Sequence, residues 1–379
     1  MKEAIVQPSI EVVEIIESPI PIPKDDEVVI KVVVAGSNPK DWKRPNWKNH
    51  AHNSGDDMAG IVHTTGSLVK TFKPGDRVAA YHHSGQPHGS FAEYAVAPEH
   101  MTFHIPSTLS FEEAATLPLA SYTAALALYI DLQLPLPFTR SPRPEAPTKK
   151  GDALLIYGVA SACGAFAAKF ARLSGIYPII GVAGRGAAFA ETLVDYVVDY
   201  RNGEDELVAS VDAILAKEGL PPKLPRVFDA ISEKGSLEAT LRLIDADGGV
   251  VSTLLPPKLF ARDKEAFRYP EGVTAINTAA PVLFDVHKAF GLVWSRYMTV
   301  LLEERRVVGH PFEVVPGGLH GVLTGLRRLY EGRVSAVKLV YRIGETGELG
   351  VVRLDGEDKK VAAVSNVIAE FPFGGGEGN

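Results

Sequence analysis

Short apolar runs separated by turn residues fill the first part of the chain. Residues 28–34 form a β-branched run, and residues 60–62 and 77–81 form two more. Residues 73–76, Lys-Pro-Gly-Asp, precede the last run with a proline that presets one backbone dihedral and a glycine that permits a tight bend. The spacing predicts a compact β-rich barrel, and the periodicity becomes helical from Phe111.

Apolar runs and helical stretches alternate through the middle of the chain. This alternation implies parallel strands joined by right-handed crossovers, and therefore an α/β fold with a doubly wound sheet. The alternating segments are residues 154–157, 165–173, 178–182, 196–200, 208–218, 226–231, 237–244 and 249–255.

Prolines interrupt the stretch before this alternation. They exclude a regular helix or a central strand there, because proline lacks an N–H donor and has a fixed φ. A surface insertion is therefore expected over residues 131–150. The prolines are Pro135, Pro137, Pro142, Pro144 and Pro147.

Past Asn277 the pattern loosens and then becomes helical again. A helix over residues 319–330 and a strand over residues 338–342 end the recognisable pattern, and we assign no role to the tail that follows. Before them, the residues expected on one packing face of a long helix are Phe290, Val293, Trp294, Tyr297 and Leu301.

The composition is that of an average globular protein. Of 379 residues, 46% are hydrophobic and 22% charged, so disorder is not expected. A formal net charge of −7 gives no electrostatic reason for a nucleic-acid partner, and no dense Lys/Arg block indicates a membrane surface. One cysteine, Cys163, excludes an intramolecular disulfide and favours a reducing compartment. Because the N-terminus lacks the apolar core of a signal peptide, we expect a soluble, cytoplasmic protein.

A small-residue turn follows the strand over residues 154–157. Residues 158–164 read Gly-Val-Ala-Ser-Ala-Cys-Gly and lead into a helix. A strand, a tight turn and a helix N-terminus set backbone N–H groups around a dinucleotide pyrophosphate. The turn departs from the full glycine fingerprint at Val159 and Ala160. Taken alone, it fits a nicotinamide cofactor and an ordinary strand-to-helix connection equally well.

Arg185 lies just after the second strand of this region. An NAD-binding unit usually carries Asp or Glu there for the adenosine 2′-hydroxyl, whereas arginine suits a 2′-phosphate. The pattern therefore indicates NADPH in preference to NADH. Tyr200 and Arg201 end the third strand and can supply a phenolic hydrogen bond and a second positive charge. The alternative for Arg185 is a solvated loop cation.

Short motifs along the chain point to a family. They are Asn38-Pro39-Lys40-Asp41-Trp42-Lys43, Gly75-Asp76-Arg77-Val78, Gly89-Ser90-Phe91-Ala92-Glu93-Tyr94, Leu117-Pro118 with Thr123-Ala124, Val198-Asp199-Tyr200-Arg201 and Lys338-Leu339-Val340. With the order of elements above, they resemble the medium-chain dehydrogenase/reductase superfamily. Within it the chain is similar to the zinc-independent, trans-acting enoyl reductases of fungal polyketide synthases, such as the lovastatin enoyl reductase.

The resemblance implies two domains. A GroES-like β-rich catalytic domain is expected over residues 1–130 and 286–379, with a C-terminal tail at 344–379. A Rossmann cofactor domain is expected over residues 151–285, after the insertion at 131–150.

Zinc is a question that this resemblance raises. Zinc-dependent members carry a Gly-His-Glu segment and a nearby cysteine ligand. The matching segment here is Gly55-Asp56-Asp57, and no cysteine precedes Cys163, so no catalytic metal is expected. His82, His83 and His88 leave a different metal site open, although a solvated loop is the expected state of that segment.

The matching positions also imply the residues of the site. Lys43, which closes the Asn-Pro-x-Asp-x-Lys motif, and Thr123 are the expected catalytic residues. The acyl chain is expected against Ala124, Ala125, Leu128 and Asp131. The expected cofactor contacts are Lys40, Asp41, Trp42, Lys43, Ser161, Ala162, Cys163, Gly164, Gly184, Arg185, Gly186, Tyr200, Leu254, Leu255, Ala336 and Val337.

Conjugate reduction is the reaction that the resemblance implies. Hydride from NADPH reaches the β-carbon of an α,β-unsaturated polyketide acyl thioester, and the carbonyl oxygen takes up the negative charge as an enolate. The implied partner is an acyl carrier domain of a polyketide synthase, and the implied state is a monomer. Two alternatives stay open. One is a stand-alone NADPH quinone or enone reductase, and the other is a reductase fold repurposed for double-bond isomerisation or cyclisation, which the altered turn and the segment with His50 and His52 suggest.

Overall fold

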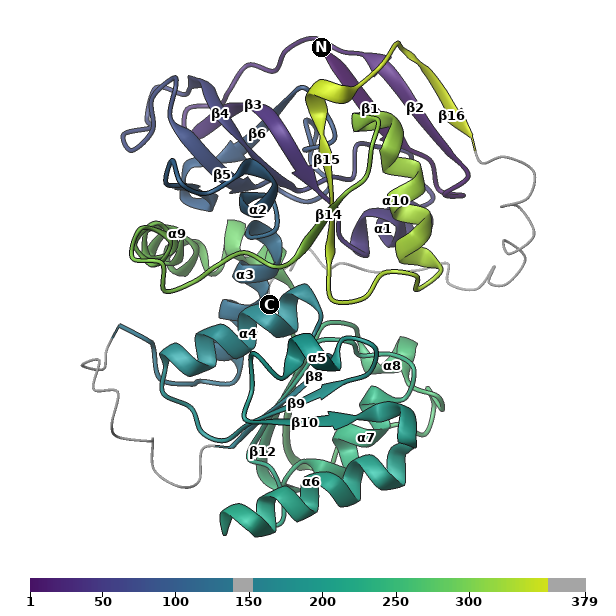
Figure 1. The fold of residues 1–379 in the computed structure, drawn as a ribbon. Coiled ribbons are helices and arrows are strands. Elements are labelled where there is room, and N and C mark those ends of the chain that lie inside the picture. The colour runs from purple at the N-terminus through teal and green to yellow at the C-terminus, as the bar shows by residue number, and fades with distance from the viewer. Residues whose placement is uncertain (139–152, 354–379) are drawn as a thin grey trace, which may run out of the picture. The chain divides into compact units, whose positions relative to one another are not determined.

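The computed structural model describes residues 1–138 and 153–353 (Figure 1). By its internal contacts the chain divides into two compact units. The first contains Met1–Pro118, Leu283–Val334 and the described residues from Lys338 on, and the second contains Leu119–Val282 and Ser335–Val337. Residues 119–130 therefore group with the second unit, whereas the domain boundaries expected from the sequence put them in the first. Residues 139–150 of the expected insertion, and the tail from residue 354, lie outside the described residues.

A seven-stranded sheet forms the centre of the first unit. Its order is β14-β15-β3-β4-β5-β7, and β6 also pairs with β3. The ten-residue β3 pairs along one edge with β4 and along the other with β6 and then β15. The strands are β3 (Glu27–Gly36), β4 (Asp57–Thr65), β5 (Arg77–Tyr81), β6 (Tyr94–Pro98), β7 (Thr102–His104), β14 (Phe312–Val314) and β15 (Lys338–Arg342).

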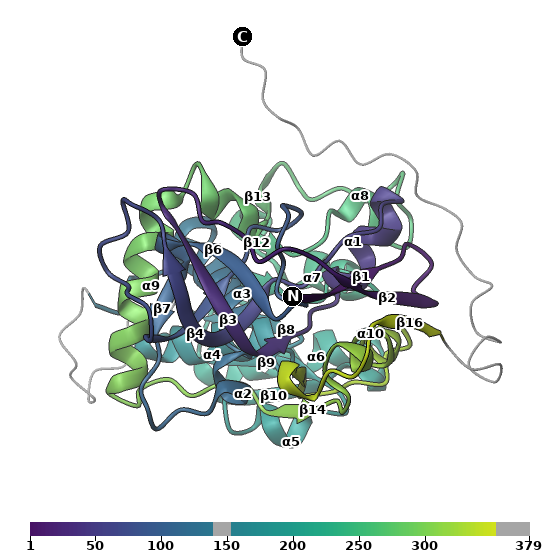
Figure 2. The same ribbon diagram turned by 90° about the horizontal axis from the view of Figure 1, so that it is seen from above.

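A second, three-stranded sheet of the first unit consists of β1 (Lys2–Val6), β2 (Val12–Glu17) and β16 (Gly350–Arg353). Figure 2 shows β16 beside β2, with which it pairs antiparallel from Gly350 opposite Ile15. The alternating apolar and charged residues of this part of the tail thus have a structural role that the sequence left unassigned.

The core of the first unit follows from the two-residue period of its strands. Val28, Ile30 and Val32 share one face of β3, and they pack in one cluster with Val322 and Leu326 of α10 (Gly321–Tyr330). The unit also contains α1 (Lys40–Lys48), α2 (Phe111–Ala114) and α9 (Lys288–Glu303).

The packing face of α9 differs in part from the predicted one. Trp294, Met298 and Leu301 are fully buried, but Val293 is 51% exposed. Because successive residues of a helix lie 100° apart, Val293 cannot share the inward direction of Trp294.

A six-stranded parallel sheet forms the second unit. Its order is β10-β9-β8-β11-β12-β13, and the chain enters at β8, moves to one edge and then returns past β8 to the other. This is the doubly wound order of a dinucleotide-binding fold. The strands are β8 (Leu154–Tyr157), β9 (Ile179–Ala183), β10 (Tyr196–Asp199), β11 (Arg226–Asp229), β12 (Asp247–Thr253) and β13 (Gly272–Asn277).

The helices of the second unit connect these strands. All four residues of β8 are buried, as expected of a parallel strand that is covered on both faces. The predicted fold class, a GroES-like domain with a Rossmann domain, is confirmed. Within the described ranges, no helix has the length and apolar character to span a membrane. The helices are α3 (Pro118–Ala125), α4 (Ala162–Leu173), α5 (Ala187–Ala190), α6 (Glu204–Glu218), α7 (Ser236–Leu243) and α8 (Pro257–Phe260).

Candidate active site

The turn between β8 and α4 lies at the carboxyl end of the first parallel strand. Gly158 has a φ of +77°, which favours glycine. Ser161 caps α4, since its Oγ accepts the N–H of Gly164 at 3.2 Å. A Cβ on Gly164 would lie 2.4 Å from the carbonyl oxygen of Gly158, so the helix begins in contact with the turn. The N-terminus of α4 thus stands close to the strand end, with the geometry that attracts anions.

Arg185 and Tyr200 follow the next two strands, β9 and β10, which pair in parallel up to Ala183 and Asp199. Tyr200 is 46% exposed and its ring covers Gly184, where a Cβ would lie 2.6 Å from the ring. Gly186 lies against Ala160 and Ala336, whose Cβ atoms would be 2.6 Å and 3.1 Å from an added Cβ. The exposed Arg185 therefore shares one strand edge with Tyr200 and with the turn after β8.

Arg201 has a carboxylate partner of its own. Its Nε donates to both oxygens of Asp199, at 2.9 and 3.0 Å, and its Nη2 contacts the same carboxylate. The hydrogen bonds from Arg201 lower the pKa of Asp199. The second positive charge expected at this edge is thus already paired with Asp199.

Asp229, at the end of β11, organises the neighbouring loop. Its Oδ1 accepts the N–H groups of Ile231 and Ser232 at 3.0 and 2.8 Å, and its Oδ2 accepts the hydroxyl of Ser236 at 2.6 Å. Ser232 in turn accepts the N–H of Leu254 at 2.8 Å. Burial raises the pKa of Asp229 to about 6. These contacts fix Leu254, one of the expected cofactor neighbours, to the end of the central strand.

Thr123 and the expected acyl-lining residues lie on α3 and on the π-helical turn Leu126–Asp131 that continues it. Thr123 is 6% exposed and its hydroxyl donates to the carbonyl of Leu119 at 2.7 Å. Ala124, Ala125 and Leu128 are fully buried. Asp131 accepts a 2.5 Å hydrogen bond from Thr278. Such π-turns occur often at functional sites.

Lys40, at the start of α1 in the first unit, is surrounded by oxygen atoms. Its ammonium lies 2.9 Å from Asp41 Oδ1, donates to the carbonyl of Ser54 at 2.6 Å and contacts the carboxylate of Asp56. The ammonium thus has one carbonyl acceptor and two carboxylates of opposite charge around it. Burial lowers the pKa of Lys40, but the two carboxylates outweigh it and raise the value overall.

The pKa values of the two carboxyl groups in this cluster shift in opposite directions. Burial raises the pKa of Asp41 to about 7, although Lys40 opposes the shift. Burial acts in the same direction on Asp56, but Lys40 and His82 outweigh it and bring the pKa to about 2. Asp56 is therefore the more acidic of the two carboxyl groups.

His82 is the fourth side chain of the cluster, after Lys40, Asp41 and Asp56. It is 2% exposed, with Nδ1 3.0 Å from Asp56 Oδ1 and Nε2 2.9 Å from the carbonyl oxygen of Pro87. The expectation of a solvated loop is therefore wrong for His82, because the Asp56 carboxylate makes burial of the imidazole favourable. Among the described residues, no group of three or more His, Cys, Asp or Glu side chains is arranged to hold a metal ion.

Lys338 joins the start of α1 to the last strand of the sheet. Its ammonium contacts Asp57 and lies 3.0 Å from Asn38 Oδ1, and Asn38 Nδ2 donates to Asp57 Oδ2 at 2.8 Å. The backbone N–H of Asn38 donates to Asp41 Oδ2 at 2.7 Å. Lys338 follows directly on Ala336 and Val337, two expected cofactor neighbours that are only partly buried.

Lys43 lies one turn further along α1 and is 8% exposed. Its Nζ is 5.6 Å from the ring centroid of Trp42 and 5.9 Å from that of Trp47. Trp42 meets Tyr330 of α10 edge to face, with centroids 5.0 Å apart. The expected catalytic lysine is thus held among aromatic rings.

Residues 24–107 match the alcohol dehydrogenase GroES-like domain. The chain is 38% identical over 328 residues to the trans-enoyl reductase fsr4 of Gibberella fujikuroi, with 85% of this chain and 92% of that protein covered. It is 32% identical to the trans-enoyl reductase ACTTS2 of Alternaria alternata, with 87% and 96% covered. The chain belongs to the trans-enoyl reductases.

The fold of this trans-enoyl reductase is also that of solved structures. The quinone oxidoreductase of Coxiella burnetii matches with a TM-score of 0.68 at 22% identity, covering 90% of this chain and 99% of that one. The CurK enoyl reductase matches with a TM-score of 0.68 at 18% identity, covering 86% and 94%. The resemblance to the trans-acting enoyl reductases, with the fold of the medium-chain dehydrogenase/reductases, is thereby confirmed at the level of family and fold.

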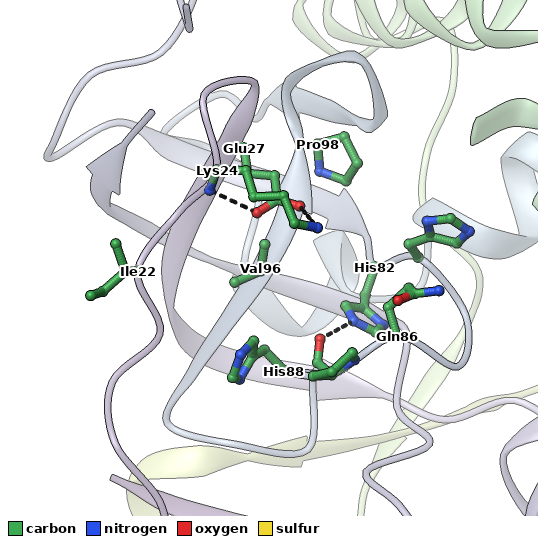
Figure 3. A pocket seen from close by; sticks show the side chains of 10 residues that line it. Ile22, Lys24, Glu27, His82, Gln86, His88, Val96 and Pro98 are labelled. Atoms are coloured by element: carbon green, nitrogen blue, oxygen red, sulfur yellow. Dashed lines mark hydrogen bonds and ion pairs between the residues drawn. The ribbon is translucent and has the colours of Figure 1, made fainter. Parts of the chain in front are cut away.

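A surface hollow of about 440 Å³ in the first unit is bounded in part by His82 of the Lys40 cluster (Figure 3). Figure 3 shows Lys24 and Glu27 paired on one side of it and His82 on another. No residue predicted for cofactor or substrate lines this hollow. We therefore do not count it as part of the candidate active site of the trans-enoyl reductase.

Sequence reasoning missed several residues that organise the site. Asp56, His82 and Lys338 come from segments far apart in the chain, so no local pattern connects them to Lys40 or Asn38. Asp229 and Ser232 gave a weak signal, since an aspartate at a strand end favours hydrogen bonds to the backbone just after it.

Proposed function

We propose that this trans-enoyl reductase uses NADPH to reduce the conjugated C=C bond of an α,β-unsaturated polyketide thioester. The membership of the family supports the reaction, and the strand edge with Arg185 and Tyr200 supports the phosphorylated cofactor. A guanidinium matches a phosphate in charge and hydrogen-bonding geometry, and an exposed phenol adds a donor.

The residues of the second unit fit a dinucleotide. Gly164 and Gly184 have no side chain, which lets the turn after β8 pack against the start of α4 and the ring of Tyr200 pack against the end of β9. The N-terminus of α4 suits the pyrophosphate, and Ser161, Ala162 and Cys163 would approach it. Arg185, Gly186 and Tyr200 would hold the 2′-phosphate, while Leu254 and Leu255 would lie by the nicotinamide.

The bound nicotinamide would supply a hydride to the β-carbon of the substrate. The protein must then stabilise negative charge on the carbonyl oxygen and deliver a proton to the α-carbon. We assign these tasks to the ammonium of Lys43 and to the hydroxyl of Thr123, which would turn from the carbonyl of Leu119 to the substrate. Ala124, Ala125, Leu128 and Asp131 would shape the acyl pocket on the π-helical turn.

The partner is proposed to be an acyl carrier domain of a polyketide synthase. The names of the relatives describe enzymes that act in trans, and this role requires only a transient contact with the synthase. We further propose a monomer that works in the cytoplasm, in keeping with a single cysteine.

A direct test follows NADPH oxidation with an enoyl thioester carried on an acyl carrier domain. Consumption of NADPH and a saturated acyl product identified by mass spectrometry are expected. A Lys43→Met variant is expected to bind NADPH or substrate more weakly or to turn over more slowly. Absence of NADPH binding at millimolar concentration would exclude both reductase functions and leave isomerisation or cyclisation. Reduction of a free quinone or enone, but not of the carrier-bound thioester, would favour the stand-alone reductase.

A further inference from the structure

The ammonium of Lys43 contacts two indole rings of its own helix. The distances from Nζ to the centroids of Trp42 and Trp47, 5.6 and 5.9 Å, lie within the roughly 6 Å over which an aromatic face attracts a cation. Lys43 is 8% exposed, so solvent screens this attraction only weakly. The two rings therefore act on a desolvated charge.

The two rings are supported by different parts of the unit. Trp42 packs against the core cluster and stands at 90° to the ring of Tyr330 on α10. Trp47 lies four residues after Lys43, which puts both side chains on one face of α1. α1 ends at Lys48, and Asn49 then takes the left-handed conformation with φ +46°. Trp42 is thus fixed by α10, while Trp47 completes the pair from the last turn of α1.

Ring faces and carboxylates hold an ammonium in different ways. Around Lys40, the carbonyl oxygen of Ser54 accepts an N–H and two carboxylates lie within ion-pair distance. An aromatic face attracts the ammonium as a whole, through its quadrupole, and directs no single N–H. The rings of Trp42 and Trp47 therefore restrain the charge of Lys43 without fixing the direction of its N–H groups.

We infer that Trp47 is a positioning residue that holds the Lys43 ammonium in place for reaction. The inference rests on the proposed function, in which Lys43 acts on the cofactor or the substrate. A lysine side chain has four flexible bonds, and restraining it before the substrate binds reduces the entropy lost in the transition state. Trp47 lies in the last turn of α1, so this part of the helix would supply the restraint on the Lys43 side chain.

A double-mutant cycle tests whether Trp47 acts through Lys43. The reaction of NADPH with the carrier-bound enoyl thioester is measured for the wild type, Trp47→Leu, Lys43→Met and the double variant. Trp47→Leu is expected to lower kcat/KM about fivefold in the wild type, as for loss of one cation–π contact, and less than about twofold in the Lys43→Met background. Trp47→Phe keeps an aromatic face and is expected to recover most of the activity.

A second measurement does not depend on activity. The rate at which acetic anhydride acetylates Lys43 is followed by peptide mass spectrometry at fixed pH. Trp47→Leu is expected to increase this rate severalfold, because the ammonium loses one of the two rings that cover it. Lys24, whose side chain is 79% exposed, is the internal reference and is expected to react equally in both proteins.

The outcomes separate this inference from the proposed function. The positioning role of Trp47 is overturned if Trp47→Leu lowers kcat/KM by the same factor with and without Lys43. An unchanged acetylation rate of Lys43 overturns it as well. If Lys43→Met leaves enoyl reduction unchanged, the role assigned to Lys43 fails instead, and the acetylation rate alone decides whether Trp47 restrains it. Thermal unfolding of each variant checks that α1 has not been lost.

Discussion

Lys338 and Asp57 form an ion pair in which both side chains are almost completely buried, at 2% and 0% exposure. Removing one partner of such a pair leaves an uncompensated charge, which typically costs about 3–5 kcal/mol. We therefore expect Lys338→Met to lower the free energy of unfolding by that amount in urea denaturation.

A double variant distinguishes the cost of the unpaired Asp57 charge from other effects of replacing Lys338. The double variant Lys338→Met, Asp57→Asn removes both charges and is expected to be more stable than Lys338→Met alone. Lys24→Met breaks the exposed pair with Glu27 and is expected to cost about 0–1 kcal/mol. A double variant no more stable than Lys338→Met would show that the isolated charge of Asp57 is not the cause.

Asp229 is expected to make the stability of the fold depend on pH. Because burial raises its pKa to about 6, the native state binds more protons than the unfolded state between about pH 4 and pH 6. Its contribution to stability is therefore present at low pH and is lost as the pH rises through about 6. Compared with Asp229→Asn, the wild type should lose about 1 kcal/mol more between pH 5.0 and 7.5. Parallel urea titrations at the two pH values measure this difference, and identical pH dependences would contradict it.

Arg185 is expected to determine the preference for NADPH. Replacing it with alanine removes a charged hydrogen-bond donor from the 2′-phosphate, and should raise KM for NADPH about tenfold or more while KM for NADH changes little. Arg201→Ala is the matched control, since Asp199 already holds that guanidinium. Equal effects of Arg185→Ala on both cofactors would place the 2′-phosphate elsewhere.

Gly164 is expected to tolerate no side chain. The Cβ of Gly164→Ala would lie 2.4 Å from the carbonyl oxygen of Gly158 and 2.8 Å from Val159 Cα, and backbone atoms cannot move aside cheaply. We expect a loss of about 1–3 kcal/mol in stability and weaker NADPH binding. Gly344→Ala, where an added Cβ meets open space, is the control and should change the unfolding midpoint little. Calorimetry and fluorescence titration with NADPH measure the two effects.

The sequence predicts the positions of individual strands and helices better than it predicts which residues contact one another. The strands over residues 77–81, 154–157 and 338–342 have the predicted ends in the structure, because their apolar runs are bounded by turn residues. The sequence pattern predicts the start of α4 at residue 165, three residues late, because residues 162–164 resemble a turn whereas Ser161 caps the helix. The class of fold required only the alternation of strands and helices.

Side-chain environments were less predictable. His82 follows a strand end and has polar neighbours in sequence, which is typical of a solvated loop, but it is buried and contacts Asp56, the residue just before β4. Lys40 matched a cofactor motif, yet its oxygen partners come partly from residues 54 and 56, which no spacing rule connects to it. The roles of Lys43, Thr123 and the remaining site residues stay predictions, since their environment is known and their ligands are not.

The ion pair of Lys338 with Asp57 also determines when the first unit can finish folding. Asp57 leaves the ribosome well before its cationic partner Lys338, which lies 281 residues further along the chain. Strand β15 completes one side of β3 at the same late stage. During synthesis the N-terminal strands must therefore wait with a solvated carboxylate and an open edge, while the segment that forms the nucleotide-binding sheet emerges whole and can fold first.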